Sequence, residues 1–468
     1  MTFRMIPLLV GTSLLAACAV GPDYKAPHPA AVATAPFAGA DSPAFTRDAA
    51  QDRWWTLYND PILTRMVEDA LRANTDIRVA AARVERARAL LRDAKSARLP
   101  TTTIDASAQR ERFSSVQTGT STSYPREAWY YDGGLSLSYE VDLFGRVRRG
   151  VEAAHGDAQA TEADADAVRL AVVADTVRAY LDVTTSAQRL KVAQDTVDLL
   201  DQSIRITGAR VDVGRSDRLD LIRVQALRDQ QAATIPQIAA DRQSALLRLA
   251  TLTGRAPQDL PSDVAQQVNT PSPAKPIPVG DGAALLARRP DVRAAERRLA
   301  ADTARIGVVT ADLYPHITLG ASGGSTALGG MDVLGAESSR WAFGPLISWT
   351  FPNIAAVKAR IAAARADSAA SLATFDGTVL NALEETERAL SNYAHAQQRV
   401  VTLAQARDEA QRAARISLAR QREGRIDFLT VLDAERTLAQ AEADLVAGRR
   451  DAAFAQVDVF RALAGGWS

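Results

Sequence analysis

The chain has 468 residues with 55 basic and 55 acidic side chains, so its formal net charge is zero. This balance provides no global positive field, and we expect no nucleic-acid partner. Charged residues make up 24% of the sequence and aromatic residues only 6%, a composition that suits long solvated helices.

The N-terminus predicts a signal segment followed by a lipid anchor. Arg4 precedes the apolar stretch 5–17, which has the layout of a secretory signal and is too short to span a bilayer. Cys18, the only cysteine, follows directly, and the site resembles a bacterial lipoprotein processing site; the alternative is a chance free cysteine. The resemblance implies that residues 1–17 are removed and that Cys18 carries covalent lipid. Because Ala19 follows instead of aspartate, it also implies the outer membrane.

Residues 18–53 are rich in proline and alanine and are predicted to be extended. A first repeat is expected over residues 54–270, opening with helices that end before Pro100. Strict alternation of polar and apolar residues then predicts strands over residues 101–113 and 133–143, each with one polar, solvent-facing side and one apolar side.

A long helix with heptad-spaced apolar residues is predicted to follow and to run to Val211. Gly214 breaks this helix, and Asp217 begins a second helix that runs to about Leu252. The first repeat therefore ends in a helical hairpin with its tip at residue 214.

A proline-rich linker, 271–284, leads into a second repeat over residues 285–468. It is predicted to contain a helix, strands over residues 316–325 and 341–351, and a helical hairpin with its tip at residue 424. The two halves match in register at an offset of about 210 to 215 residues. Matching pairs are Asp76-Ile77-Arg78 with Asp291-Val292-Arg293, Ser138-Tyr139 with Ser348-Trp349, and Gly214-Arg215 with Gly424-Arg425. A match across helices, strands and turns indicates an internal duplication.

The last quarter of the chain, 353–467, contains no proline and predicts two very long helices. Gly424 ends the first of them, and Asp427 can cap the second. At ~1.5 Å per residue the helix before the turn is on the order of 100 Å long, more than an ordinary globular core needs.

The four predicted strands per chain have the length of tilted strands that cross a bilayer. The alternative is a small soluble sheet. In lipid no strand edge stays unpaired, so copies of the chain must share one sheet. Two copies supply eight strands and a filled interior, whereas three supply twelve and a water-filled lumen, so we expect at least a trimer.

Several stretches resemble the TolC-like outer-membrane efflux channels, in the lipoprotein branch typified by OprM and NodT. The matching stretches cover nearly the whole mature chain: Cys18 to Tyr24, Trp54-Trp55 with Asp60, Ala70-Leu71 with Asn74, Tyr139 to Arg146, and Leu285 to Glu296. The resemblance implies a mainly helical, internally duplicated protein. Three copies form a twelve-stranded transmembrane β-barrel continuous with a long α-helical periplasmic tunnel.

The same resemblance implies a role as the passive exit duct of a tripartite efflux pump for drugs or other small toxic compounds. The expected partners are two further copies of the chain, a periplasmic adaptor, an inner-membrane transporter of the resistance-nodulation-division type, and outer-membrane lipid. No cofactor is expected beyond the lipid on Cys18.

A gate is expected where the helices converge at the periplasmic tip. Leu429, Asp433 and Arg436 fall on one helical face. By resemblance, Leu429 and Asp433 match the apolar and acidic rings that constrict such channels, with Arg436 as a basic partner. The alternative is a weak surface pair beside a core leucine. Some family members have a second acidic residue where this chain has Thr430, so a second acidic ring is not assigned.

Two further sets of residues are candidates. Glu140 and Asp142 alternate with the apolar face of their strand, so we expect them to face the lumen near the periplasmic rim, either biasing passage toward cations or wetting the interior. The hairpin tips, Gly214-Arg215 and Gly424-Arg425, are expected to be exposed and to dock the adaptor; ordinary helix-ending glycines are the compatible alternative.

No catalytic or metal site is predicted, because the histidines fall in different elements without a nucleophile or phosphate-loop motif. These are His28, His155, His316 and His395. Two other functions remain open: a channel of the same fold for type I protein secretion, and a periplasmic coiled-coil scaffold lipoprotein without a pore. The substrate is not readable from the sequence.

Overall fold

The computed structural model of the chain forms two compact units built from interleaved segments. The sheet unit comprises residues 1–27, 83–162 and 294–376, and the hairpin unit comprises residues 28–82, 163–293 and 377–468. The described residues are 19–27, 35–49, 51–112, 127–273, 276–329, 332–352 and 354–464. The predicted signal segment 1–17 and the predicted lipidation site Cys18 lie outside them.

Most of the described chain is helical. The longer helices are α1 (Pro61–Ala73), α2 (Thr75–Ser96), α4 (Arg146–Asp212), α5 (Arg218–Ala232), α6 (Thr234–Leu252), α9 (Pro290–Ala311), α10 (Ile354–Arg422) and α11 (Phe428–Ala462). The shorter elements are η3 (Ala38–Asp41), η4 (Trp54–Tyr58), η5 (Pro257–Asp259), α7 (Ser262–Gln266), α8 (Gly282–Arg288), η6 (Ala336–Ser338) and a parallel pair of β1 (Phe45–Thr46) and β4 (Ile277–Pro278). Within the described ranges, none of the helices has the length and apolar character required to cross a membrane.

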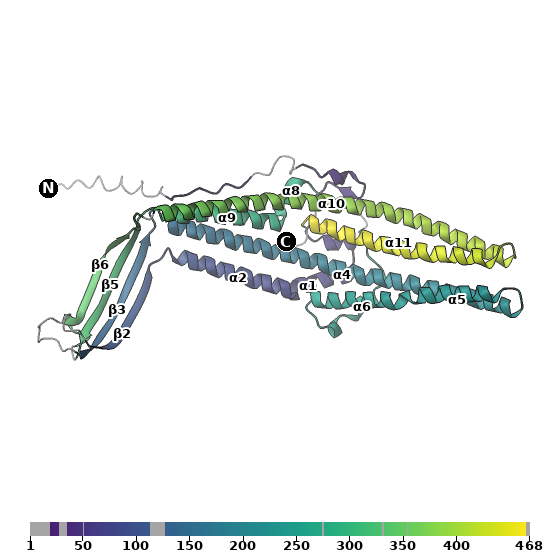
Figure 1. The fold of residues 1–468 in the computed structure, drawn as a ribbon, viewed down its shortest axis with the longest axis horizontal. Helices are drawn as coiled ribbons and strands as arrows, with labels where there is room; N and C mark the ends of the chain where they lie inside the picture. Colours follow the sequence, from purple (N-terminus) through teal and green to yellow (C-terminus); the bar gives the residue numbers. More distant parts are fainter. Residues whose placement is uncertain are drawn as a thin grey trace. The chain divides into compact units, whose positions relative to one another are not determined.

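In the sheet unit, four described strands form one antiparallel sheet in the order β2-β3-β5-β6 (Figure 1). The strands are β2 (Thr101–Arg112), β3 (Glu127–Val141), β5 (His316–Leu328) and β6 (Ser339–Ser348). β3 is longer than expected because its first residue, Glu127, already pairs with Arg112 of β2. The two repeats meet in this sheet through β3 and β5, whose register aligns Leu137 with Ala321.

The two faces of the sheet differ as the alternating pattern predicts. One face is apolar and exposed: Trp341 is 84% exposed, Ile104 80% and Phe343 76%. The other face carries a polar cluster in which the Asp132 carboxylate accepts hydrogen bonds from the Thr326 hydroxyl at 2.7 Å and from Arg340 Nη2 at 2.8 Å. Since neighbouring residues of a strand point to opposite faces, this separation follows directly from the sequence period of two.

In the hairpin unit, α4 turns back into α5, and α10 turns back into α11 (Figure 1). At the first turn Gly214 has a φ of +71°, and at the second Gly424 has a φ of +73°, left-handed values that glycine adopts without strain. The helix that follows each turn is capped by an aspartate, Asp217 or Asp427, whose side chain accepts a backbone N–H. Both predicted hairpin turns are therefore present.

The returning arm of the first hairpin is two helices, whereas one helix was expected from Asp217 to about Leu252. α5 ends at Ala232 and α6 begins at Thr234. Pro236 explains the break, because proline has no backbone N–H to donate and its ring clashes with the preceding turn. Within the first turn of α6 the same proline is tolerated.

The core of the hairpin unit is built around the Trp54-Trp55 motif. The Trp54 ring is fully buried and stacks on Phe460 of α11, with ring centroids 4.6 Å apart. Asp60 caps α1 by accepting the N–H of Ile62 at 2.8 Å, and its second oxygen accepts the Tyr180 hydroxyl of α4 at 2.7 Å. The segment before α1 is thus attached to both long hairpins.

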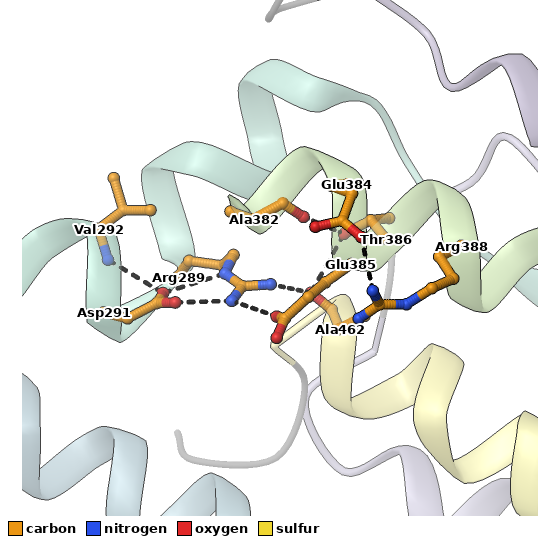
Figure 2. Close-up of polar contacts among 9 residues, drawn as sticks. All are labelled: Arg289, Asp291, Val292, Ala382, Glu384, Glu385, Thr386, Arg388 and Ala462. Carbon is orange, nitrogen blue, oxygen red and sulfur yellow. Dashed lines mark hydrogen bonds and ion pairs between the residues drawn. The ribbon is translucent and has the colours of Figure 1, made fainter. Parts of the chain in front are cut away.

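Arg289, at the junction of α8 and α9, holds the C-terminal end of α11 (Figure 2). Its guanidinium donates to the Ala462 carbonyl at 3.1 Å and pairs with Asp291 at 2.6 Å and Glu385 at 2.8 Å. Arg289 is only 8% exposed. A cation at a helix C-terminus satisfies carbonyls that have no partner within the helix.

Candidate functional site

The predicted gate residues lie together on an exposed face near the start of α11. Leu429 is 45% exposed, and the side chains of Asp433 and Arg436 are 71% and 70% exposed. Arg436 Nη2 lies 3.4 Å from Asp433 Oδ1. Leu429 therefore does not belong to a core within the described part of this chain. The ion pair, so exposed, contributes little to stability.

The opposite face of the same helical turns holds α11 against the first hairpin. Phe428 is buried in a small apolar cluster with Leu200 of α4 and with Val224 and Leu227 of α5. This face also carries Val431, which is 2% exposed. The cluster positions the start of α11 and leaves the face with Leu429 and Asp433 unpacked.

Glu435 is a buried acid on the face of α11 that packs against α4, and it is not among the residues predicted from the sequence. The Ser203 hydroxyl of α4 donates to its Oε1 at 2.8 Å, while Oε2 is buried without a hydrogen-bond partner. Burial raises the pKa of this carboxyl, and the Ser203 hydrogen bond opposes the shift. Val431, Glu435 and Ala439 are four residues apart in the sequence. This helical spacing indicates that the glutamate lies on the same buried face as its two apolar neighbours.

Both hairpin tips are exposed, as predicted for Gly214-Arg215 and Gly424-Arg425. The Arg215 N–H donates to the Arg210 carbonyl at 2.7 Å, and the Arg425 N–H donates to the Arg420 carbonyl at 2.9 Å. These bonds close the ends of the preceding helices. The space around both glycine Cα atoms is open, so glycine is required here by backbone conformation and not by crowding.

Glu140 and Asp142 lie where β3 meets α4. Glu140 is on the polar face of the sheet, where Arg146 binds it through Nε at 2.8 Å and through Nη2, and His316 Nδ1 lies 3.8 Å away. Asp142 follows β3 and accepts the backbone N–H groups of Val147 and Arg148, so it caps α4. Both carboxylates thus have structural partners, and Arg146 offsets the charge of Glu140.

The segment that follows Cys18 is fixed to the sheet unit beside the end of β3. The Val20 N–H donates to the Phe144 carbonyl at 3.1 Å, and Asp23 pairs with the buried Arg149 at 2.6 Å. Gly21 lies against Gly307 of α9 so closely that an added Cβ would come within 2.5 Å of the Gly307 Cα. The segment predicted to be extended is therefore docked on the sheet unit over residues 20–23.

No group of three His, Cys, Asp or Glu side chains within the described ranges is arranged to hold a metal ion. Of the histidines in these ranges, His316 has carboxylates on both sides, Glu140 at 3.8 Å and Asp312 at 3.7 Å.

Comparison with known proteins places these features in a family context. A family profile described as "Outer membrane efflux protein" matches residues 66–255 and again residues 283–465, which confirms the internal duplication. The nodulation protein T of Rhizobium leguminosarum bv. trifolii is 31% identical over 434 residues, covering 92% of this chain and 91% of that protein. The solvent efflux pump outer membrane protein SrpC of Pseudomonas putida is 31% identical over 477 residues, covering 100% of this chain and 99% of that protein.

A solved structure of the outer-membrane channel OprN superposes with a TM-score of 0.89 at 37% sequence identity. The superposition covers 96% of this chain and 100% of that one. The mainly helical, duplicated fold with a four-stranded sheet is therefore the fold of outer-membrane channels.

Proposed function

The chain belongs to the outer membrane efflux protein family, and on that premise we propose that three copies of it form the exit duct of a tripartite efflux pump. The family consists of efflux channels and not of enzymes. The single observation that supports the duct most strongly is one exposed apolar sheet, with two open edges, in the same chain as two long helical hairpins.

The apolar face of the sheet fits a bilayer. Trp341 lies near the start of β6, and Trp349, which is also exposed, follows its end. At ~3.3 Å per residue they are about 26 Å apart along the chain, close to the ~25 Å apolar band of membrane strands with aromatic residues at both borders.

Assembly follows from the sheet edges. β2 and β6 are the edge strands of one copy, and in hydrocarbon each unpaired backbone group costs several kcal/mol. Pairing β6 of one copy with β2 of the next removes these edges once the ring closes. Three copies supply twelve strands around a water-filled lumen lined by the polar face.

Anchoring by lipid is supported by the docked N-terminal segment. Ala19 lies against Gly145, four residues after the end of β3. Acylation of Cys18, the residue before Ala19 in the sequence, would attach lipid next to this docked segment. A lipid chain there adds anchoring without spanning the membrane.

The hairpin unit supplies the gate and the docking tips. In a trimer the exposed faces with Leu429, Asp433 and Arg436 meet at the axis and constrict the passage. A periplasmic adaptor binds the exposed hairpin tips at Gly214-Arg215 and Gly424-Arg425, and its binding widens the gate. Transport is passive, and an inner-membrane transporter of the resistance-nodulation-division type supplies the energy.

The proposed cargo is small toxic compounds. SrpC is named as part of a solvent efflux pump, and this chain aligns with it over its full length. The inner-membrane transporter selects the compound, because a wide wetted lumen makes few specific contacts.

The test is purification of the lipidated protein in detergent, followed by mass determination and conductance in planar bilayers. We expect a particle of three chains that conducts ions. A folded monomer in buffer without detergent, or a trimer without conductance, contradicts the duct.

A further inference from the structure

Glu435 lies in the contact between α11 and α4, where the neighbouring positions on α11 are apolar. It is 6% exposed, between Val431 and Ala439, which are 2% and 8% exposed. Its Oε1 accepts the Ser203 hydroxyl at 2.8 Å, and its Oε2 is buried without any partner. A buried carboxylate with one hydrogen bond is costly, so this site favours the neutral acid.

The position of Glu435 on α11 couples it to the gate. A helix turns about 100° per residue, so Glu435 and Asp433, two residues apart, lie on opposite sides of it. Leu429, Asp433 and Arg436 form the exposed face, while Val431 and Glu435 face the first hairpin. Any rotation or shift of α11 that moves the gate face also moves Glu435 relative to Ser203.

Three charged groups on α4, α10 and α11 have ion-pair partners other than Glu435. Asp201 of α4 pairs with Arg228 of α5 at 3.0 Å. On α11, Asp433 pairs with Arg436. On α10, Arg407 contacts Asp408 at 3.1 Å.

One heptad after Glu435, Glu442 also faces the α4 side of α11. Burial raises the pKa of Glu442, the Asp195 charge of α4 reinforces the shift, and Arg407 opposes it. Asp195 itself pairs with Lys191 at 3.0 Å. Burial therefore keeps two acids of α11, Glu435 and Glu442, closer to neutrality than exposed glutamates.

We propose that Glu435 is a proton-dependent positioning residue for the gate. As a neutral acid it allows α11 to pack on α4 and holds the tip closed; when it loses its proton, the buried charge weakens this contact and the gate face moves with α11. This inference rests on the proposed gate at Leu429 and Asp433.

The direction of the pH effect follows from proton binding. The closed tip, with Glu435 buried, holds the proton to higher pH than an open tip in which water reaches the carboxyl. Acid therefore favours closure, and raising the pH through the titration of Glu435 favours opening. Each unit of difference between the closed and open pKa values shifts the equilibrium by about tenfold.

The experiment measures the open probability of the lipidated trimer in planar bilayers between about pH 4 and pH 8, from near the ordinary pKa of glutamate upward. For the native protein we expect an increase on the order of tenfold across this range. The variant Glu435→Gln, neutral at every pH, is expected to stay mostly closed and to lose this increase.

Two further variants separate Glu435 from other acids. Glu409→Gln removes an exposed glutamate of α10 that pairs with Arg412, and it should keep the native pH profile. Ser203→Ala removes the hydrogen bond that favours the ionised form, so the profile should move to higher pH. A merely structural role for Glu435 predicts no such movement.

Three outcomes overturn the proposal: an unchanged profile in Glu435→Gln, a profile in Ser203→Ala that stays in place, or a pH response removed by Asp433→Asn alone. If the Glu435→Gln variant does not assemble into a trimer, the pH profile of Ser203→Ala tests the proposal in its place. A native trimer that conducts no ions at any pH contradicts the duct itself, which distinguishes that failure from the failure of this inference.

Discussion

At its C-terminal end α11 is held by a stacked aromatic pair, Trp54 and Phe460, and by Arg289 on the Ala462 carbonyl. At its N-terminal end the same helix is held by one small cluster around Phe428 and by the contact of Glu435 with Ser203. One end is fixed by extensive burial and charge-assisted hydrogen bonds. The other has few buried contacts, and elements with few buried contacts are the ones that open locally. The contrast predicts that α11 opens more readily at its tip than at its C-terminal end.

The largest expected effect comes from substituting matched phenylalanines at the two ends. Phe460→Ala should cost about 4 to 5 kcal/mol, because it removes a large side chain from a well-packed core. Phe428→Ala should cost about 3 kcal/mol, because the cluster at the tip has few buried members and the residues packed around it are only partly buried. Thermal melting by circular dichroism measures the first effect.

Hydrogen exchange along α11 measures the second effect and sharpens the contrast. In Phe428→Ala, faster exchange is expected near Glu435 and unchanged exchange near Phe460. Equal acceleration along the whole helix would show that the two ends are not independent.

Breaking the polar contacts at the fixed end is the next largest effect. Arg289→Ala removes the guanidinium that donates to Asp291, Glu385 and the Ala462 carbonyl, and leaves Asp291 with the Val292 N–H and Ala462 with the longer Thr386 contact. We expect a loss of about 3 kcal/mol, below the top of the range for buried pairs because both carboxylates keep contact with water. Melting temperature is the measurement. The control Arg388→Ala breaks a mostly exposed pair with Glu384 and should cost at most about 1 kcal/mol.

A smaller effect is expected at the turn that precedes the loose end. Gly424→Ala places a Cβ at a φ of +73°, which costs roughly 1 to 2 kcal/mol. Gly377→Ala, in the interior of α10 with open space around its Cα, should instead stabilise the helix by about 0.5 to 1 kcal/mol. The two variants are compared by melting temperature. Changes of the same sign would mean that the left-handed turn does not limit stability.

The smallest effect on stability is expected at the gate face. The double variant Asp433→Ala with Arg436→Ala removes an exposed pair and should change stability by less than about 1 kcal/mol. Single-channel conductance should nevertheless rise, because three copies of both side chains leave the constriction. The matched control, Glu409→Ala with Arg412→Ala on α10, removes an equally exposed pair and should leave conductance unchanged. Equal conductance in both variants would remove Asp433 and Arg436 from the gate.

Local features of the fold were predictable because they depend on neighbours in sequence. Glycine conformation and aspartate capping placed both hairpin turns, and the period of two placed Ile104 and Phe343 on the apolar face. The break at Ala233 departs from the predicted continuous helix, because the helical pattern continues on both sides while Pro236 lacks the N–H that would continue the helix. The exposed face with Leu429, Asp433 and Arg436 follows from helical spacing, and its role as a gate stays a prediction.

Sequence by itself determined the duplication, the membrane-length strands and the long helical hairpins, since each is a periodic pattern that a continuous stretch of chain contains. Only the tertiary structure decided which distant residues meet. Arg289 reaches Ala462, Arg149 reaches Asp23, and Glu435 reaches Ser203, across 173, 126 and 232 residues of sequence. Periodicity shows that a side chain faces inward, but the surroundings it finds there depend on how the helices pack. For Glu435 that packing buries the carboxyl, which raises its pKa, and supplies the Ser203 hydroxyl, which opposes the shift.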